Sequence, residues 1–206
     1  VMGRANNPLR QILNYAEERF LRGKIPLLYA LTVRAQDKAK GKVVTRGLFI
    51  GEKFECFWRA ARLSVQVNFQ MLDKRIQKAV VLLREDEYHS TWLGNKAIYR
   101  TRMAIADGGS LIILAPGVRM FGEDKAIDAL IRKYGYRTTP EVMQYVKENK
   151  DLLKNLSAAA HLIHGTSEGR FSITYCPGKL SKKEIEGVGY KYADLQEMLK
   201  RYNPET

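Results

Sequence analysis

Apolar positions along this chain repeat with two different periods, and the changes of period predict where helices and strands lie. From Pro8 to about Leu21, apolar residues recur every three or four positions, which indicates an amphipathic helix. Two segments rich in β-forming residues follow, Ile25–Val33 and Lys42–Gly51, and the charged stretch between them predicts a hairpin. A second helix is expected from about Lys53 to Asp73, because its apolar residues again share one face.

From residue 78 onward, short apolar runs alternate with helical patterns. We predict strands at 78–83, 110–115 and 170–176, and a short extended segment at 190–193. The predicted helices are 92–106, 123–133, one opened by Thr139-Pro140, one near Asp151–Ile163, one capped by Ser181 with Glu184 three residues later, and 194–202.

This order favours an α/β fold with a mostly parallel, doubly wound sheet and helices on both faces, preceded by a helix and a β-hairpin segment. We place a boundary near residues 74–78. Residues 78–206 are then expected to form a Rossmann-like C-terminal domain. Residues 1–77 are expected to belong to, or pack on, a further N-terminal domain that holds a cofactor.

Positive charge is concentrated at the front of the chain. The formal net charge is +13, and residues 1–80 carry 16 basic and 6 acidic side chains against 19 and 16 in residues 81–206. Either a nucleic-acid-binding surface or a surface that meets an acidic domain explains this asymmetry. The front lacks the sequence patterns of helix-turn-helix, zinc-finger or RNA-recognition modules, so nucleic acid is not the expected partner.

Cysteine usage and hydropathy indicate a cytoplasmic protein. Cys56 and Cys176 stand alone, without the spacing of a zinc site or a disulfide framework. No apolar run is long enough to cross a bilayer, and no signal-peptide pattern begins the chain, so no membrane partner is expected. The Val-Met-Gly start suggests a fragment of a longer protein.

Familiar cofactor motifs are missing from the sequence. No G-x-G-x-x-G follows a strand, and no phosphate-binding G-x-x-x-x-G-K-[ST] occurs, which argues against a conventionally bound nucleotide. His161 and His164 lie three residues apart on a predicted helix and face one way. A metal site needs three or four ligands, and no further ligand is evident, so we expect no metal in this chain.

The stretch Glu87–Gly109 collects polar and charged side chains after a predicted strand, where α/β proteins usually place their chemistry. Trp92, Lys96 and Arg100 follow one another at four-residue spacing, so a continuous helix would present all three on one face. The two cations could hold a substrate carboxylate, with the indole as a wall. An amphipathic helix with a solvated, charged face explains the same spacing.

Three segments together resemble the C-terminal half of the nickel-pincer-dependent lactate racemase family. They are "NNPLRQILNYAEE", "AVVLLREDEYHSTWLGNKAIYRTRMAIADGGSLIILAPGV" and "LSKKEIEGVGYKYADLQEMLKRY". The family places a Lys eleven residues before an Asp-Gly-Gly, as Lys96 stands before Asp107-Gly108-Gly109. It also has a Gln three residues before this Lys, where this chain has Leu93. The amino-acid sequence of the middle segment is similar to that of a subgroup labelled D-mannonate oxidoreductases or epimerases.

The resemblance implies a racemase or epimerase acting at C2 of a 2-hydroxy acid such as lactate or a sugar acid. In that family a nickel-pincer nucleotide accepts a hydride, and the cofactor and its histidines lie in the N-terminal half. No cofactor is therefore expected in this chain alone, which should be inactive by itself. The resemblance implies a catalytic and substrate-binding role for Lys96, and we expect four further residues to bind substrate: His89, Trp92, Asn95 and Arg100.

Two other functions remain open from the sequence alone. One is a nucleotide-dependent sugar-acid oxidoreductase, and the other is a basic nucleic-acid-binding module.

Overall fold

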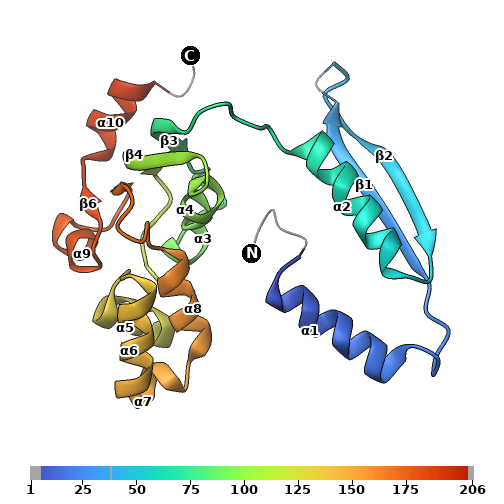
Figure 1. Cartoon of the computed structure of the whole chain (residues 1–206). Helices are drawn as coiled ribbons and strands as arrows, with labels where there is room; N and C mark the ends of the chain where they lie inside the picture. Colours follow the sequence, from blue (N-terminus) through green and yellow to red (C-terminus); the bar gives the residue numbers. More distant parts are fainter. Residues whose placement is uncertain (1–5, 38, 204–206) are drawn as a thin grey trace. The chain divides into compact units, whose positions relative to one another are not determined.

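The computed structural model describes residues 6–37 and 39–203 and divides the chain into two units, Val1–Met71 (unit 1) and Leu72–Thr206 (unit 2). Each unit has its own sheet and its own helices (Figure 1). No helix in the described part of the chain is both long enough and apolar enough to cross a bilayer.

Unit 1 begins with the predicted amphipathic helix. Helix α1 spans Pro8–Ala16, and the side chain of Asn7 caps it by accepting a hydrogen bond from the Arg10 amide at 3.0 Å. Proline in the first turn favours the helix start because its missing N–H is not needed there. The helix continues as a π-helical turn, η1 (Glu17–Leu21). The predicted helix is thus present, although its last turn is π-helical.

An antiparallel hairpin and one helix complete unit 1. Strands β1 (Tyr29–Asp37) and β2 (Lys42–Gly51) pair in the predicted hairpin, with a bulge at Val33/Arg34, and α2 (Phe54–Asn68) runs along it (Figure 1). The first strand lies four residues later than the predicted Ile25–Val33, because residues 34–37 of the charged stretch pair with β2 instead of forming the turn. Helix α2 ends earlier than expected. Phe69 adopts an extended backbone, so the helix does not reach residue 73, and the side-chain amide of Asn68 donates to the Arg34 carbonyl at 3.0 Å.

Unit 2 is built on a parallel sheet, which confirms the predicted fold class. Its strands are β3 (Ile76–Leu82), β4 (Ile105–Ala115), β5 (Ser172–Pro177) and β6 (Lys191–Tyr192), hydrogen-bonded in that order. The order is sequential and does not reverse among the described strands.

Helices cover both faces of this sheet, also as predicted. Leu111 and Ile113 of β4 face a core shared with the connecting helices, whereas Ile112 and Leu114 face the C-terminal helix α10 (Leu195–Tyr202). The connecting helices thus form one layer, and α10 supplies the other. Between the strands lie α3 (Thr91–Gly94), α4 (Lys96–Thr101), α5 (Lys125–Tyr134), α6 (Thr139–Glu148), α7 (Lys150–Leu153), α8 (Leu156–His164) and α9 (Lys182–Gly187).

Two predicted helices are interrupted. The helix expected at 92–106 is divided at Asn95 into α3 and α4 and ends at Thr101. The helix expected at 151–163 is divided into α7 and α8, because the Asn155 side chain caps a new helix start by accepting from the Ala158 amide.

Strand β4 begins five residues earlier than predicted and contains Asp107-Gly108-Gly109. The Asp-Gly-Gly stretch coincides with a register irregularity against β3. Gly108 has φ +76°, a conformation that glycine adopts without a steric penalty.

Candidate functional site

The segment that carries the predicted site residues is fixed to the loop after β4 by backbone hydrogen bonds. Ser90 caps α3 by accepting from the Leu93 amide, and its hydroxyl also donates to Glu123. The Thr91 and Trp92 amides donate to the Met120 and Phe121 carbonyls at 3.1 and 2.9 Å. These bonds satisfy the first amides of the short helix, which lack partners within it.

Lys96 and Arg100 line one pocket of about 360 Å³ between α4 and the end of β3. They lie one turn apart on α4, as their spacing predicts. Val81, Leu83 and Ala97 form an apolar wall, and Lys96 Nζ lies 5.9 Å from the centre of the Tyr88 ring. The remaining polar side chains of the lining are Arg84, Glu87 and Thr101.

The charges of this pocket leave its two helical cations available. Arg84 is paired with Asp86, with Nη2 at 2.6 Å from a carboxylate oxygen. Neither Lys96 nor Arg100 forms an ion pair with any carboxylate among residues 6–37 and 39–203. A bound carboxylate would therefore meet cations that need not first break an internal ion pair.

The other three predicted site residues do not line this pocket. Trp92 packs on the core, and its ring contacts that of His161 of α8, with 4.3 Å between ring centres and 33° between ring planes. Asn95 is only 1% exposed, because it sits under the junction of α3 and α4. The half-buried His89 contributes its carbonyl to a hydrogen bond from the Arg119 amide. The structure thus brings together Lys96 and Arg100, with Tyr88 and Thr101 as neighbours that the sequence did not single out.

Beneath α3 lies a buried polar cluster that sequence analysis missed. The Tyr136 hydroxyl is 2.7 Å from Thr91 Oγ1 and 3.0 Å from His161 Nε2. Burial, with a smaller contribution from His164, lowers the pKa of His161 to about 4, so its imidazole is neutral at pH 7. Burial likewise raises the pKa of Tyr136, which keeps its hydroxyl protonated.

His161 and His164 do not converge on a common ligand-binding point. His161 contacts Trp92 and Tyr136, whereas the His164 ring lies beside Tyr99 with 5.9 Å between ring centres. In the part of the chain that the structure describes, no three His, Cys, Asp or Glu side chains gather where they could hold a metal ion. The described residues therefore do not fit a resident nickel ion.

Asp107-Gly108-Gly109 has a structural role away from the Lys96 pocket. Arg170 donates to the Asp107 carboxylate at 2.7 Å and to the Ile105 carbonyl at 2.9 Å, and the Gly108 amide donates to the Arg170 carbonyl. Ile105 pairs with Ile76 at the start of β3, whereas the pocket lies at its end. At ~3.3 Å per residue, about 20 Å of strand separates them.

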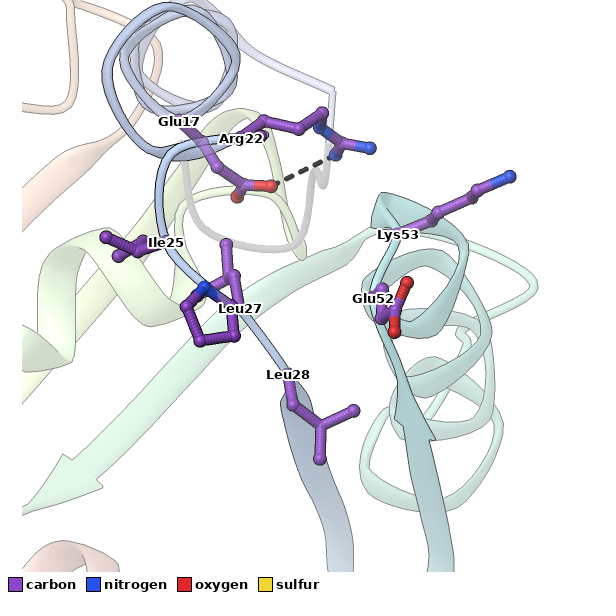
Figure 2. A pocket seen from close by; sticks show the side chains of 9 residues that line it. Glu17, Arg22, Ile25, Leu27, Leu28, Glu52 and Lys53 are labelled. Carbon is purple, nitrogen blue, oxygen red and sulfur yellow. Dashed lines mark hydrogen bonds and ion pairs between the residues drawn. The ribbon is translucent and has the colours of Figure 1, made fainter.

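A second cavity, of about 420 Å³, lies in unit 1 at the end of the hairpin (Figure 2). Figure 2 shows Arg22 turned toward Glu17, with 3.1 Å between nitrogen and oxygen. Glu17 is buried and also accepts a hydrogen bond from Tyr29, and Glu52 adds a second carboxylate to the lining. This cavity has two carboxylates, and one of them already pairs with Arg22. It is therefore a poorer anion site than the Lys96 pocket, because carboxylates repel an anion.

Comparison with known proteins gives structural matches only. No protein-family profile matches the chain. No curated protein sequence matches it. The crystal structure of a protein from Thermotoga maritima is similar, with 29% sequence identity and a TM-score of 0.71, over 97% of this chain and 50% of that one. The lactate racemase apoprotein from Thermoanaerobacterium thermosaccharolyticum is similar over 95% of this chain and 44% of that one, with 14% identity and a TM-score of 0.65.

This chain spans about half the length of both structures. At such low identity the second match is evidence of a shared architecture. The chain has a lactate racemase-like fold.

Proposed function

We propose that this chain is the C-terminal, substrate-binding part of a racemase or epimerase that acts at C2 of a 2-hydroxy acid. The observation that carries the proposal is the pocket in which Lys96 and Arg100 lie together without carboxylate partners among the described residues. The lactate racemase-like fold and the sequence resemblance support the same reaction class. Fold alone does not imply function, so the proposal depends on this pocket.

In the proposed complex the substrate carboxylate binds Lys96, and Arg100 supports it from the next turn of α4. The apolar wall of Val81 and Leu83 limits water around the ion pair, which strengthens it. Both cations hold the acid in one orientation, so that C2 is presented in a fixed position. Lys96 thereby offsets the negative charge that the substrate brings.

We propose a sugar acid such as mannonate as the substrate. The pocket volume of about 360 Å³ exceeds what a three-carbon acid fills. Glu87, Tyr88 and Thr101 line the same pocket and offer hydrogen-bond partners for the hydroxyl groups of a longer chain. The sequence resemblance to mannonate-labelled relatives favours the same class.

We propose that a nickel-pincer nucleotide, which would accept the hydride, is held by polypeptide outside this chain. The described residues do not fit a nickel ion, and none of them is assigned a step at the metal. What this chain supplies in the proposal is binding and orientation of the acid.

The test replaces Lys96 in the complete protein. Lys96→Ala should lower kcat/KM for the preferred 2-hydroxy acid by roughly ten- to a hundredfold, the effect of one lost charge-assisted hydrogen bond. Lys182→Ala is the matched control, because this side chain is 68% exposed and lies on α9, away from the pocket. If the parent and both variants interconvert a panel of 2-hydroxy acids and aldonates at one rate, the pocket is not the substrate site.

We also propose that unit 1 packs on an N-terminal domain of the same protein. Leu28, Leu48 and Ile50 are 64%, 59% and 59% exposed around the hairpin, and the α1 residues Leu9 and Ile12 are 56% and 63% exposed. Uncovered apolar patches of this kind mark interaction surfaces. Basic residues outnumber acidic ones 13 to 5 in residues 1–71, which favours a partner surface with an acidic rim and opposes pairing of two identical copies.

Co-expression with the adjoining coding sequence tests this partner. Hydrogen exchange of the Leu48 and Ile50 amides should slow in the longer protein relative to this chain alone. Unchanged exchange would mean that the hairpin has no partner. Slowing that depends only on the concentration of this chain would mean that the partner is a second copy.

A further inference from the structure

A chain of hydrogen bonds runs from α8 to the helix that precedes Lys96. His161 Nε2 lies 3.0 Å from the Tyr136 hydroxyl, which lies 2.7 Å from Thr91 Oγ1, which in turn is 3.0 Å from the Phe121 carbonyl. Thr91, Tyr136 and His161 are buried residues with exposed fractions of 0%, 4% and 8%, so water does not compete for these bonds.

The protons available on these groups give the series of hydrogen bonds a single direction. The Phe121 carbonyl only accepts hydrogen bonds, so the Thr91 hydroxyl donates its one proton to it. Thr91 Oγ1 must then accept from the Tyr136 hydroxyl, which leaves the Tyr136 oxygen to accept from Nε2–H of His161. The network thus assigns His161 to the Nε2–H tautomer.

Rings and backbone pack tightly around the same junction. Tyr136 stacks on Tyr190 with 4.7 Å between ring centres, and Tyr190 stacks on Tyr175 at 5.4 Å. A Cβ on Gly94 would come within 2.5 Å of the Tyr175 hydroxyl, and one on Gly165 within 2.3 Å of the Tyr136 ring. The α3–α4 segment therefore rests directly on these tyrosines.

We propose that Tyr136 and His161 are positioning residues for the Lys96 pocket, because they hold the α3–α4 segment through the Thr91 hydroxyl. Neither residue lines the pocket, so neither is expected to touch substrate. Thr91 begins α3, which ends at Gly94, and Asn95 joins it to Lys96, the first residue of α4. A shift at Thr91 is therefore passed along five residues to the cation. Only the expected effect on substrate depends on the proposed function.

Tyr136→Phe tests the hydrogen-bond chain while keeping the ring stack. In this chain labelled with ¹⁵N, amides 91–98 should exchange about three- to tenfold faster relative to amides 111–114 of β4, because the buried hydrogen bond to Thr91 is lost together with the one to His161. The His161 imidazole nitrogens should report Nε2–H in the parent and a mixture of tautomers in Tyr136→Phe. An Nδ1–H tautomer in the parent, or equal acceleration at both segments, would overturn the proposal.

Tyr134→Phe is the matched control. Tyr134 is also a buried tyrosine, and its hydroxyl donates one hydrogen bond, 2.6 Å to Asp151, which joins α5 to α7 and does not involve α3. Its loss should leave the 91–98 to 111–114 ratio unchanged. Selective acceleration of 91–98 in the control would show that any buried tyrosine has this effect.

The complete protein supplies a separate reading. Tyr136→Phe should raise KM for the 2-hydroxy acid about three- to tenfold with a smaller change in kcat, and Tyr134→Phe should change neither. If the parent turns over no 2-hydroxy acid, the proposed function fails, whereas the exchange and tautomer measurements still decide whether the two residues position α3.

Discussion

The two units of this chain differ sharply in how they treat apolar side chains. In unit 2, Leu111, Ile113 and Tyr175 are 0% exposed, whereas in unit 1 Ile12 and Tyr15 are 63% and 65% exposed. Helix α1 buries no apolar residue at all among those described. Unit 2 therefore has the interior of an independent domain, whereas the described apolar residues that unit 1 buries are only Val33, Ala35 and Ala60.

This difference teaches that local pattern and stability are separate matters. The hairpin and its helix follow directly from sequence periodicity, yet an isolated two-stranded hairpin is at best marginally stable in water. Each unpaired edge and each exposed apolar face needs a cover from elsewhere. Unit 2 closes its sheet between two helical layers and needs no such cover for its central strand β4.

Separating the units should give the largest effect. Residues 72–206 expressed alone should unfold cooperatively on heating, because their core is internal to the fragment. Residues 1–71 alone should show no cooperative transition by circular dichroism. A sharp melting transition for the smaller fragment would contradict the comparison, since it would require a core that the exposed side chains do not provide.

Matched truncations inside each unit give the next largest effect. Ile113→Ala removes a fully buried side chain of β4 and should lower the free energy of unfolding by about 2–5 kcal/mol. Ile50→Ala removes a side chain that is 59% exposed and should change it by no more than about 0.5 kcal/mol in this chain. Urea titration measures both. A larger loss of unfolding free energy from Ile50→Ala in the longer protein would show that the added polypeptide packs on Ile50.

Acid should weaken unit 2 through His161. Its folded pKa of about 4 lies below the ordinary value of 6.5, so between these values the unfolded chain binds more protons than the folded chain. Stability from this group is complete above pH 6.5 and is lost as pH falls toward 4, by up to about 3 kcal/mol. Burial also lowers the pKa of His164, which acts in the same direction.

His161→Gln separates the two histidines, because the glutamine amide can still donate to Tyr136. The variant should lose most of the pH dependence between pH 6.5 and 4 in urea titrations. Carboxylates such as Asp151, whose pKa is lowered to about 2 chiefly by hydrogen bonds from Lys133 and Tyr134, act at lower pH. An unchanged slope in His161→Gln would mean that His161 is not the group responsible.

Sequence predicted those features that neighbouring residues determine. The capping box of Ser181 and Glu184 and the proline-opened helix at Thr139 involve contacts within a few residues, and the hairpin joins two strands that are adjacent in sequence. The pairing of Lys96 with Arg100 in one pocket also follows from four-residue helical spacing.

Features that depend on distant contacts were missed. The break at Asn95 occurs where Gly94 approaches Tyr175, and the Thr91–Tyr136–His161 contacts join residues 45 and 25 positions apart. Trp92 accordingly faces His161 instead of the pocket. The eleven-residue spacing of Lys96 and Asp107 was used as a sign of the site. In the structure Lys96 lies in the pocket, whereas Asp107 binds Arg170 near the opposite end of β3. No local pattern carries that information.

The smallest expected effect compares two helix caps. Ser181 accepts from the Glu184 amide, and Glu184 in turn accepts from the Ser181 amide at 2.8 Å. Helix α9 also buries Ile185 completely, so Ser181→Ala should lower the free energy of unfolding of unit 2 by about 1 kcal/mol. Asn7→Ala removes an equivalent cap, but α1 has no buried side chain to couple it to a core.

Urea unfolding followed by Trp92 fluorescence, with Trp58→Phe as the background, reads unit 2 alone. Ser181→Ala should shift this curve and Asn7→Ala should not, because a cap stabilises a domain only through the packing of the helix that it begins. Equal shifts from both variants would mean that α1 is coupled to the core of unit 2. That result would contradict the contrast between the two units.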